Sequence, residues 1–237
     1  MANNYFQFKQ FRIDQAGCVM KVTTDASLFG AWVANQFPSS ELALDIGGGT
    51  GLLSLMVAQK NETNIDIIEI EEECFAQMKQ NVESSAWKDR INCIFNDIID
   101  FNPDYKYDII LSNPPFHQGQ LKSDKSSINL ARHGDELTLE ILFKKIFDLL
   151  KKEGCFYLLM PAYRDQETIS VAKSYGLHCL KKAVVKQSFH HDPFRIMFAF
   201  SKTKQSEETV EEIVIKNNED QYTNEFIYNL KDYYLNL

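Results

Sequence analysis

Short apolar segments and amphipathic segments alternate along this chain, and the alternation restricts the possible fold more than any other feature. Residues 42–46 have the composition of a short buried strand, and residues 52–59 follow with a helical pattern. Strands are then predicted at 64–71, 91–95, 107–111 and 155–160, helices at 72–86 and 139–150, and two closing strands at 177–189 and 194–200. Strands that alternate with helices in this way form a parallel sheet covered by helices on both faces.

We therefore predict an α/β, Rossmann-like fold with a mainly parallel seven-stranded sheet and an antiparallel closing strand. Residues 1–237 are predicted to form one domain. Within it, residues 1–41 are an N-terminal extension over the ligand site, and residues 205–237 are a C-terminal strand and helix extension. The last helix has an apolar stripe that is most simply a packing face, made of Tyr222, Phe226, Leu230 and Tyr233.

The composition is that of a soluble globular protein, with 44% apolar and 24% charged residues. No apolar run reaches membrane-spanning length, and the first residues lack a basic region followed by an apolar one. We expect a cytoplasmic monomer without a membrane partner. The cysteines are odd in number and never spaced as C-x-x-C, which indicates reduced thiols rather than a zinc or redox motif: Cys18, Cys74, Cys93, Cys155 and Cys179.

Charge is distributed unevenly along the chain. The net charge of −8 argues against a protein that coats nucleic acid generally, but residues 161–204 have a net charge of +5 and residues 205–237 one of −6. A basic segment in an acidic protein can guide a polyanion to one place. The cationic candidates for substrate binding are Lys181, Lys182, Lys186 and Arg195. The alternative is that these are solvated charges on the surface.

The loop after the first predicted buried strand, "DIGGGTG", starts at Asp45 and contains Gly47 and Gly49. It matches neither the G-x-G-x-x-G dinucleotide pattern nor a P-loop. An acid just before a glycine turn repels a phosphate but accepts a cationic ligand. Glu69 and Asp97 end the next two strands and suit ribose hydroxyls and an adenine amine. This pattern favours S-adenosylmethionine. The alternative is that the acids cap helices or turns.

The strand at 107–111 ends at an unusual corner, Asn113-Pro114-Pro115-Phe116. Proline cannot donate to a sheet, and it fixes the backbone so that the Asn113 side-chain oxygen and the Pro114 carbonyl can point at one spot. Both are acceptors, so the group held there should be a donor such as –NH₂. Phe116 offers a flat face for a planar ring. The alternative, a plain strand terminator, explains the prolines but not the asparagine and the aromatic residue.

Histidines provide weaker signals. His117 follows the corner and lies within reach of a base held there, but a lone histidine is not sufficient to assign a role. No acid–histidine ligand set surrounds His190 and His191, so we predict no metal site.

The glycine loop and the Asn-Pro-Pro-Phe corner resemble those of class I methyltransferases that modify exocyclic or amide nitrogens. A nearer resemblance covers almost the whole chain. The segments "FKQFRIDQ", "MKVTTDASLFGAW", "DIGGGTGLLSLMVAQ", "SNPPF", "RIMFAFS" and the terminal "YTNEFIYNLKDYYLNL" are similar to those of the tRNA1(Val) adenine-37 N6-methyltransferase family. Two departures are small: Thr23 stands where the family more often has glycine, and Phe116 where it often has tyrosine.

This resemblance implies methylation of the adenine just 3′ of a valine tRNA anticodon, with the tRNA anticodon loop as partner and S-adenosylmethionine as cofactor. It implies that residues 113–116 hold the base and that Arg132 meets phosphate or anchors the loop after the corner. The residues implied to hold the cofactor are Asp45, Gly47, Gly49, Glu69, Asp97 and Asn113, with Lys21, Thr24 and Asp25 closing over its methionine end.

Three other functions stay open. RNA guanine-N2 methyltransferases share the corner but usually carry a second, duplicated domain. Glutamine-N5 methyltransferases share it too, but use a helical N-terminal domain that 41 residues cannot supply. A catalytically silent cofactor-binding adaptor is the third alternative, and the intact Asn113 and glycine loop argue against it.

Overall fold

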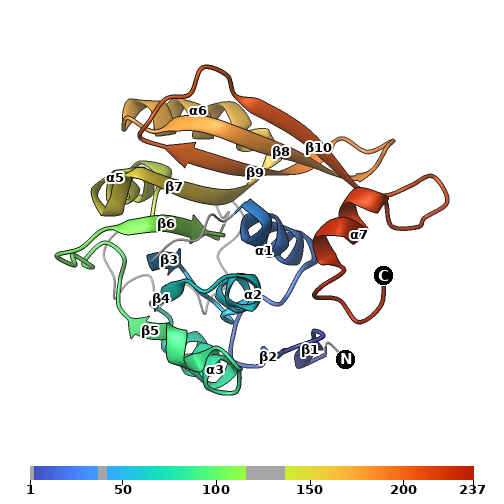
Figure 1. Cartoon of the computed structure of the whole chain (residues 1–237), viewed down its shortest axis with the longest axis horizontal. Helices are drawn as coiled ribbons and strands as arrows, with labels where there is room; N and C mark the ends of the chain where they lie inside the picture. Colours follow the sequence, from blue (N-terminus) through green and yellow to red (C-terminus); the bar gives the residue numbers. More distant parts are fainter. Residues whose placement is uncertain (1–2, 37–41, 116–136) are drawn as a thin grey trace, which may run out of the picture.

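The computed structural model describes residues 3–36, 42–115 and 137–237, and its centre is an eight-stranded sheet that runs in Figure 1 from β10 at the top to β5 at the bottom. The strand order is β10-β8-β9-β7-β6-β3-β4-β5, and β1 and β2 form a separate ribbon. The strands are β1 (Tyr5–Gln7), β2 (Arg12–Asp14), β3 (Leu42–Ile46), β4 (Asn64–Glu69), β5 (Ile91–Phe95), β6 (Tyr107–Ser112), β7 (Leu150–Pro161), β8 (His178–Ser188), β9 (Pro193–Ser201) and β10 (Thr209–Lys216).

The predicted fold class is confirmed, with one strand added. The seven predicted strands are β3 to β9, and β9 is the antiparallel closing strand, since it runs against both β7 and β8. The other neighbours pair in parallel. The eighth strand is β10, which comes from the C-terminal extension and pairs with β8 at the edge of the sheet.

Helices cover both faces of the sheet, as predicted. One hydrophobic core contains buried side chains of α1, α2, α3 and α7, and the other contains those of α5 and α6. Among the described residues, no helix is both long enough and apolar enough to cross a bilayer. The helices are α1 (Thr24–Gln36), α2 (Leu52–Lys60), α3 (Glu72–Glu83), α5 (Leu139–Leu149), α6 (Asp165–Ser174) and α7 (Asn224–Leu230), with 3₁₀ turns η1 (Lys88–Arg90) and η2 (Ala162–Arg164).

Helix α1 lies within the predicted N-terminal extension, residues 1–41, where no helix was predicted. Its residues from Ala26 to Ala34 are all buried. A helix that is apolar on every side has no amphipathic stripe, so its periodicity is not visible in the sequence. Strand β7 begins five residues before the predicted strand, because the residues up to Gly154 form an irregularity within the strand instead of lying before it. A Cβ at Gly154 would lie 2.8 Å from the Asp108 carbonyl oxygen, so only glycine fits there.

The expectation that all five thiols are reduced is wrong in one place. Cys18, in the loop between β2 and α1, forms a disulfide with Cys74 in the first turn of α3. The other three cysteines are free. The bonded cysteines are 56 residues apart in the sequence. Only the passage of the loop over the start of α3 brings them together.

The two ends of the chain lie side by side, as Figure 1 shows at the lower right. Phe8 forms an isolated bridge with Tyr234, and the Lys9 amide donates to the Tyr233 carbonyl at 2.8 Å. The predicted packing role of the C-terminal stripe is confirmed for three of its four residues, because Phe226, Leu230 and Tyr233 are fully buried, whereas Tyr222 precedes α7 and is 36% exposed. The stripe therefore contributes to the core rather than to a binding surface.

Candidate active site

The carboxyl ends of β3, β4 and β6 meet at one edge of the sheet. Ile46, the last residue of β3, lies opposite Ile68 of β4 and Ser112 of β6. The Ser112 hydroxyl also donates to the Ile46 carbonyl at 2.9 Å. The glycine loop after β3 and the Asn113 corner after β6 are therefore neighbours. This edge is where open α/β sheets bind ligands.

The glycine loop turns back sharply over the end of β4. The amides of Gly47 and Gly48 both donate to the Ile68 carbonyl, at 2.9 and 3.0 Å. Gly47 has φ +71° and Gly49 has φ +56°, which favours glycine at both positions. A Cβ built on Gly47 would meet no described atom within 4 Å. The loop therefore leaves open space directly beside its backbone, as a close-lying ligand requires.

Asp45 is buried below this loop with an incomplete set of partners. Its Oδ2 accepts a hydrogen bond from the Ser54 hydroxyl of α2 at 2.7 Å, while no described group donates to its buried Oδ1. Burial raises the pKa of Asp45 to about 7; the Ser54 hydrogen bonds oppose this shift, and the nearby Glu69 adds to it. A cationic group would stabilise the ionised carboxylate here. Sequence reasoning missed Ser54, whose only signal is its place in the first turn of α2.

The Asp45→Asn variant should show the cost of this buried charge. Between about pH 4 and 7 the folded protein keeps a proton on Asp45 that the unfolded chain has lost, so stability falls as pH rises through that window. Without ligand, we expect the variant to gain at least about 3 °C in Tm over the wild type at pH 8.5, since one pKa unit is about 1.4 kcal/mol. At pH 4 the gain should vanish. Thermal unfolding at the two pH values measures this, and a pH-independent difference would contradict it.

Glu69 and Asp97 occupy the predicted positions but act on the backbone in this structure. Glu69 Oε2 accepts from the Gly49 amide at 2.8 Å, and its Oε1 accepts from two amides that follow it in the chain, at 2.8 and 2.9 Å. Asp97 Oδ1 accepts from the Ile99 amide at 2.8 Å, as a turn cap does. The turn-capping alternative is thus true of Asp97, and Glu69 fixes the shape of the glycine loop.

Asn113 lies at the corner directly after β6, and one polar atom of its side chain has no hydrogen-bond partner among the described residues. Its side-chain Oδ1 is buried and accepts no hydrogen bond from the described residues. A buried acceptor without a donor is costly, so such an atom marks a place where a donor can bind. Pro114 is partly exposed and Pro115 exposed, which leaves the corner accessible. Phe116, His117 and Arg132 lie outside the described residues.

Residues 21–25, which the resemblance implies to close over the methionine end of the cofactor, form contacts with other parts of the protein. Lys21 Nζ donates to the carbonyls of Gln15 and Cys18 and so stabilises its own loop. Thr24 begins α1. Asp25 Oδ2 accepts from Arg195 Nε of β9 at 2.7 Å. The structure thus joins a residue predicted for the cofactor to one predicted for the substrate, which the sequence did not indicate.

The three lysines of β8, which belong to the basic segment, all have carboxylate partners. Strand β10 pairs with β8 and brings its carboxylates beside the three lysines of β8. The ion pairs are Lys181–Glu211 at 2.9 Å, Lys186–Glu212 at 2.7 Å, and Lys182 with Asp165 at 3.0 Å and Glu208 at 3.9 Å. These lysine side chains are between 15% and 23% exposed. Their predicted role in RNA binding stays a prediction, and each of the three already has a carboxylate partner.

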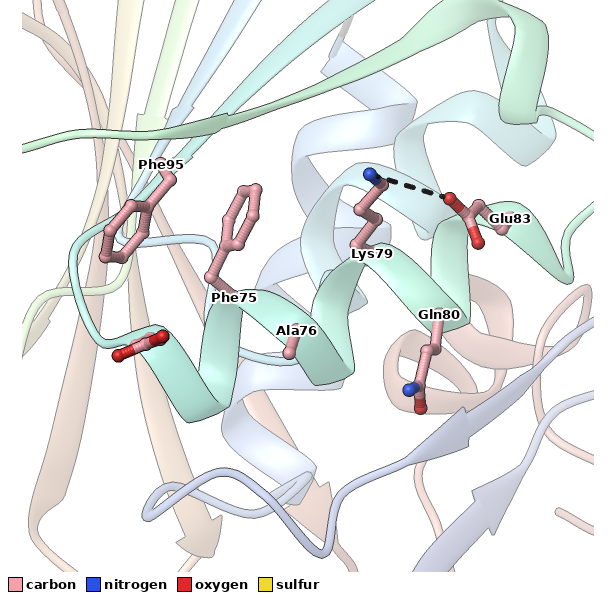
Figure 2. Close-up of a pocket in the computed structure, with 7 residues that line it drawn as sticks. Phe75, Ala76, Lys79, Gln80, Glu83 and Phe95 are labelled. Atoms are coloured by element: carbon pink, nitrogen blue, oxygen red, sulfur yellow. Dashed lines mark ion pairs between the residues drawn. The ribbon is translucent and has the colours of Figure 1, made fainter.

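A cavity of about 490 Å³ lies elsewhere, on the outer side of α3 next to the end of β5 (Figure 2). Phe75 and Phe95 form its apolar end, with ring centroids 5.2 Å apart. Lys79 and Glu83 pair across the other end at 3.9 Å. None of the predicted site residues that the structure describes lines this cavity, so it is distinct from the strand-end site discussed above.

The fold and this arrangement of strand ends define a class I methyltransferase. Residues 24–159 match the methyltransferase small domain family. The structure is similar to that of a predicted O-methyltransferase from Agrobacterium tumefaciens, with a TM-score of 0.67, 17% identity, and 88% of this chain and 95% of that one covered.

More specifically, the chain belongs to the tRNA1(Val) (adenine(37)-N6)-methyltransferase family. It is 38% identical to the member from Bacteroides thetaiotaomicron over 240 residues and 36% identical to that from Phocaeicola vulgatus over 237 residues. Both alignments cover 100% of each chain. The resemblance noted in the sequence is therefore confirmed.

Proposed function

We propose that this protein methylates N6 of adenine 37, beside the anticodon of a valine tRNA, with S-adenosylmethionine as methyl donor. The relatives from Bacteroides thetaiotaomicron and Phocaeicola vulgatus are both named tRNA1(Val) (adenine(37)-N6)-methyltransferase, which supports this reaction. The observation that carries the proposal is a pair of buried oxygens at two adjacent strand ends, Asp45 Oδ1 and Asn113 Oδ1, to which no described residue donates. The Asp45 oxygen suits a cationic group at the glycine loop, and the Asn113 oxygen suits an amine at the corner.

The residues of the glycine loop fit the donor. Open space beside Gly47 admits a ligand against the backbone, and the buried carboxylate of Asp45 favours a positive charge. The residues that would hold S-adenosylmethionine are Asp45, Gly47, Gly49, Glu69, Asp97 and Asn113, together with Lys21, Thr24 and Asp25. When bound, it supplies the methyl group: its S–CH₃ bond breaks as the N6–CH₃ bond forms, which leaves a neutral thioether.

Asn113 and the Pro114 carbonyl act on the other reactant. An adenine amine is a weak nucleophile because its lone pair is delocalised into the ring. Two acceptors that hold its hydrogens favour a tetrahedral nitrogen, whose lone pair is then available for methyl transfer. Phe116 is proposed to stack on the base, with Pro115 stiffening the corner and Arg132 meeting phosphate. After transfer the nitrogen loses a proton to water, so no strong base is needed.

The rest of the chain supports this site. We propose that residues 1–237 act as one domain and as a monomer in the cytoplasm, with residues 1–41 over the cofactor and substrate site and residues 205–237 supporting them. The ion pair of Asp25 with Arg195 holds the start of α1 against β9, beside the site.

The experiment is mass spectrometry of tRNA from cells with and without this protein. Valine tRNA from the deletion strain is expected to lack N6-methyladenine at position 37, and the wild-type gene should restore it. Purified protein with S-adenosylmethionine and unmodified tRNA should give the same product. Methylated guanine, or methylated glutamine in a release factor, would favour one of the alternative activities instead. Stoichiometric cofactor binding without any methylated product would indicate an adaptor.

A further inference from the structure

Part of the sheet continues beyond the edge where the candidate active site lies. The register links Ser112, at the end of β6, to Leu158 of β7. It continues from Leu158 to Phe198 of β9 and then to Lys182 of β8. Residues 183–188 of β8 and 193–197 of β9 therefore extend past the level of Ser112. At about 3.3 Å per residue, this hairpin reaches on the order of 20 Å beyond it.

The tip of this hairpin presents an aromatic ring to solvent. Phe189 is 55% exposed, and the neighbouring His190 and His191 are exposed as well. The tip is an ordered turn: the His191 amide donates to the Ser188 carbonyl at 3.2 Å, and the Ser188 hydroxyl lies 2.7 Å from His191 Nδ1. A ring held on a rigid turn loses little conformational entropy when it binds a partner.

A second exposed aromatic residue lies at the base of the same extension. Tyr163 is 79% exposed in η2, immediately after β7 ends at Pro161. Pro161 lies opposite Arg195 of β9, and η2 packs against β9. Both residues thus follow strand ends at the same edge of the sheet as Ser112 and lie beyond its level. Tyr163 comes after β7, the neighbour of β6, and Phe189 comes after β8, three strands away from β6.

We propose that Phe189 at the β8–β9 tip, assisted by Tyr163, stacks on unpaired bases of the RNA loop that carries the target adenine. The inference rests on the proposed function. RNA loops are recognised mainly through unstacked bases that lie on aromatic or histidine side chains. The lysines of β8 are paired with carboxylates of β10 and α6, so an exposed planar ring at the tip of the same hairpin is the better candidate for holding the RNA loop.

The test measures binding of an anticodon stem-loop RNA with an unmodified adenine, by fluorescence anisotropy, and cofactor affinity, by calorimetry. Phe189→Ala is expected to weaken RNA binding roughly 10-fold, as expected for the loss of one stacked base, and to leave cofactor affinity unchanged. Phe189→Leu, which keeps an apolar side chain without a flat ring, should weaken RNA binding nearly as much as Phe189→Ala does. The matched control is Phe147→Ala. Phe147 is also an exposed aromatic residue, at 41%, but it lies near the end of α5. Strand β7 starts directly after this helix, at the edge of the sheet opposite to the candidate site.

Fluorescence adds an independent readout. In Phe189→Trp, the added indole should be quenched when the RNA binds, whereas in Phe147→Trp it should not. Unchanged RNA affinity in Phe189→Ala, with wild-type protein that methylates tRNA, would overturn this inference alone. If the wild-type protein methylates no adenine in tRNA, the proposed function fails, and the inference fails with it.

Discussion

Replacing Asn113 by alanine is expected to reduce methyl transfer to tRNA by a factor on the order of 10² or more, while cofactor affinity falls far less, because Asn113 is only one of several residues proposed to hold the cofactor. The variant removes the buried oxygen that has no donor in the structure, and with it one of the two acceptors proposed for the amine. That contact matters most as the nitrogen becomes tetrahedral, so kcat should fall more than KM rises. Single-turnover methylation and calorimetry with S-adenosylmethionine measure the two effects separately.

A matched variant controls for the loss of any buried amide. Asn229 on α7 is also buried, and it pairs with Asn35 at 3.2 Å and with the Glu225 carbonyl at 2.8 Å. Asn229→Ala should reduce stability but leave the methylation rate of the folded enzyme near that of the wild type. Asn113→Ala with wild-type activity would rule out the proposed hold on the amine.

The second large effect is expected for Gly47→Ala, which should weaken S-adenosylmethionine binding about 10- to 100-fold. The added Cβ meets no described protein atom within 4 Å, so it would occupy the space left for the ligand. Overpacking of this kind costs about 1–3 kcal/mol. Alanine at φ +71° costs a further ~1–2 kcal/mol of stability. Calorimetry measures the affinity, and thermal unfolding checks that the variant is folded.

Gly176→Ala separates the effect of backbone strain on stability from the effect of the added methyl group on cofactor affinity. Gly176 has φ +76°, so its substitution introduces a similar backbone strain, but the turn lies between α6 and β8. Its added Cβ would meet the Phe147 ring at 3.2 Å rather than open space. This variant should lose stability and keep its cofactor affinity. If a folded Gly47→Ala binds the cofactor as tightly as the wild type, the ligand does not cross this loop.

Several features of this protein could be read from local sequence because their causes are local. Apolar runs such as residues 42–46 form buried strands, and the stripe of α7 packs into the core. The positions of Asp45, Glu69 and Asn113 near strand ends placed them at one edge, since parallel strands bring their carboxyl ends together. The order of strands and helices was therefore enough to predict the class of fold and the edge of the sheet where the candidate site lies.

Other features depend on contacts between distant segments and were decided only by the tertiary structure. The pairing of β10 with β8 gives Lys181 and Lys186 their carboxylate partners, and the sequence does not show that these two strands are neighbours. Helix α1 is buried on every side, so its residues show no helical periodicity in the sequence. The Cys18–Cys74 bond forms because the β2–α1 loop crosses over α3. Whether a polar atom is satisfied also depends on all that surrounds it. The unpaired oxygen of Asn113 is therefore a property of the folded protein, although the sequence alone marked its position.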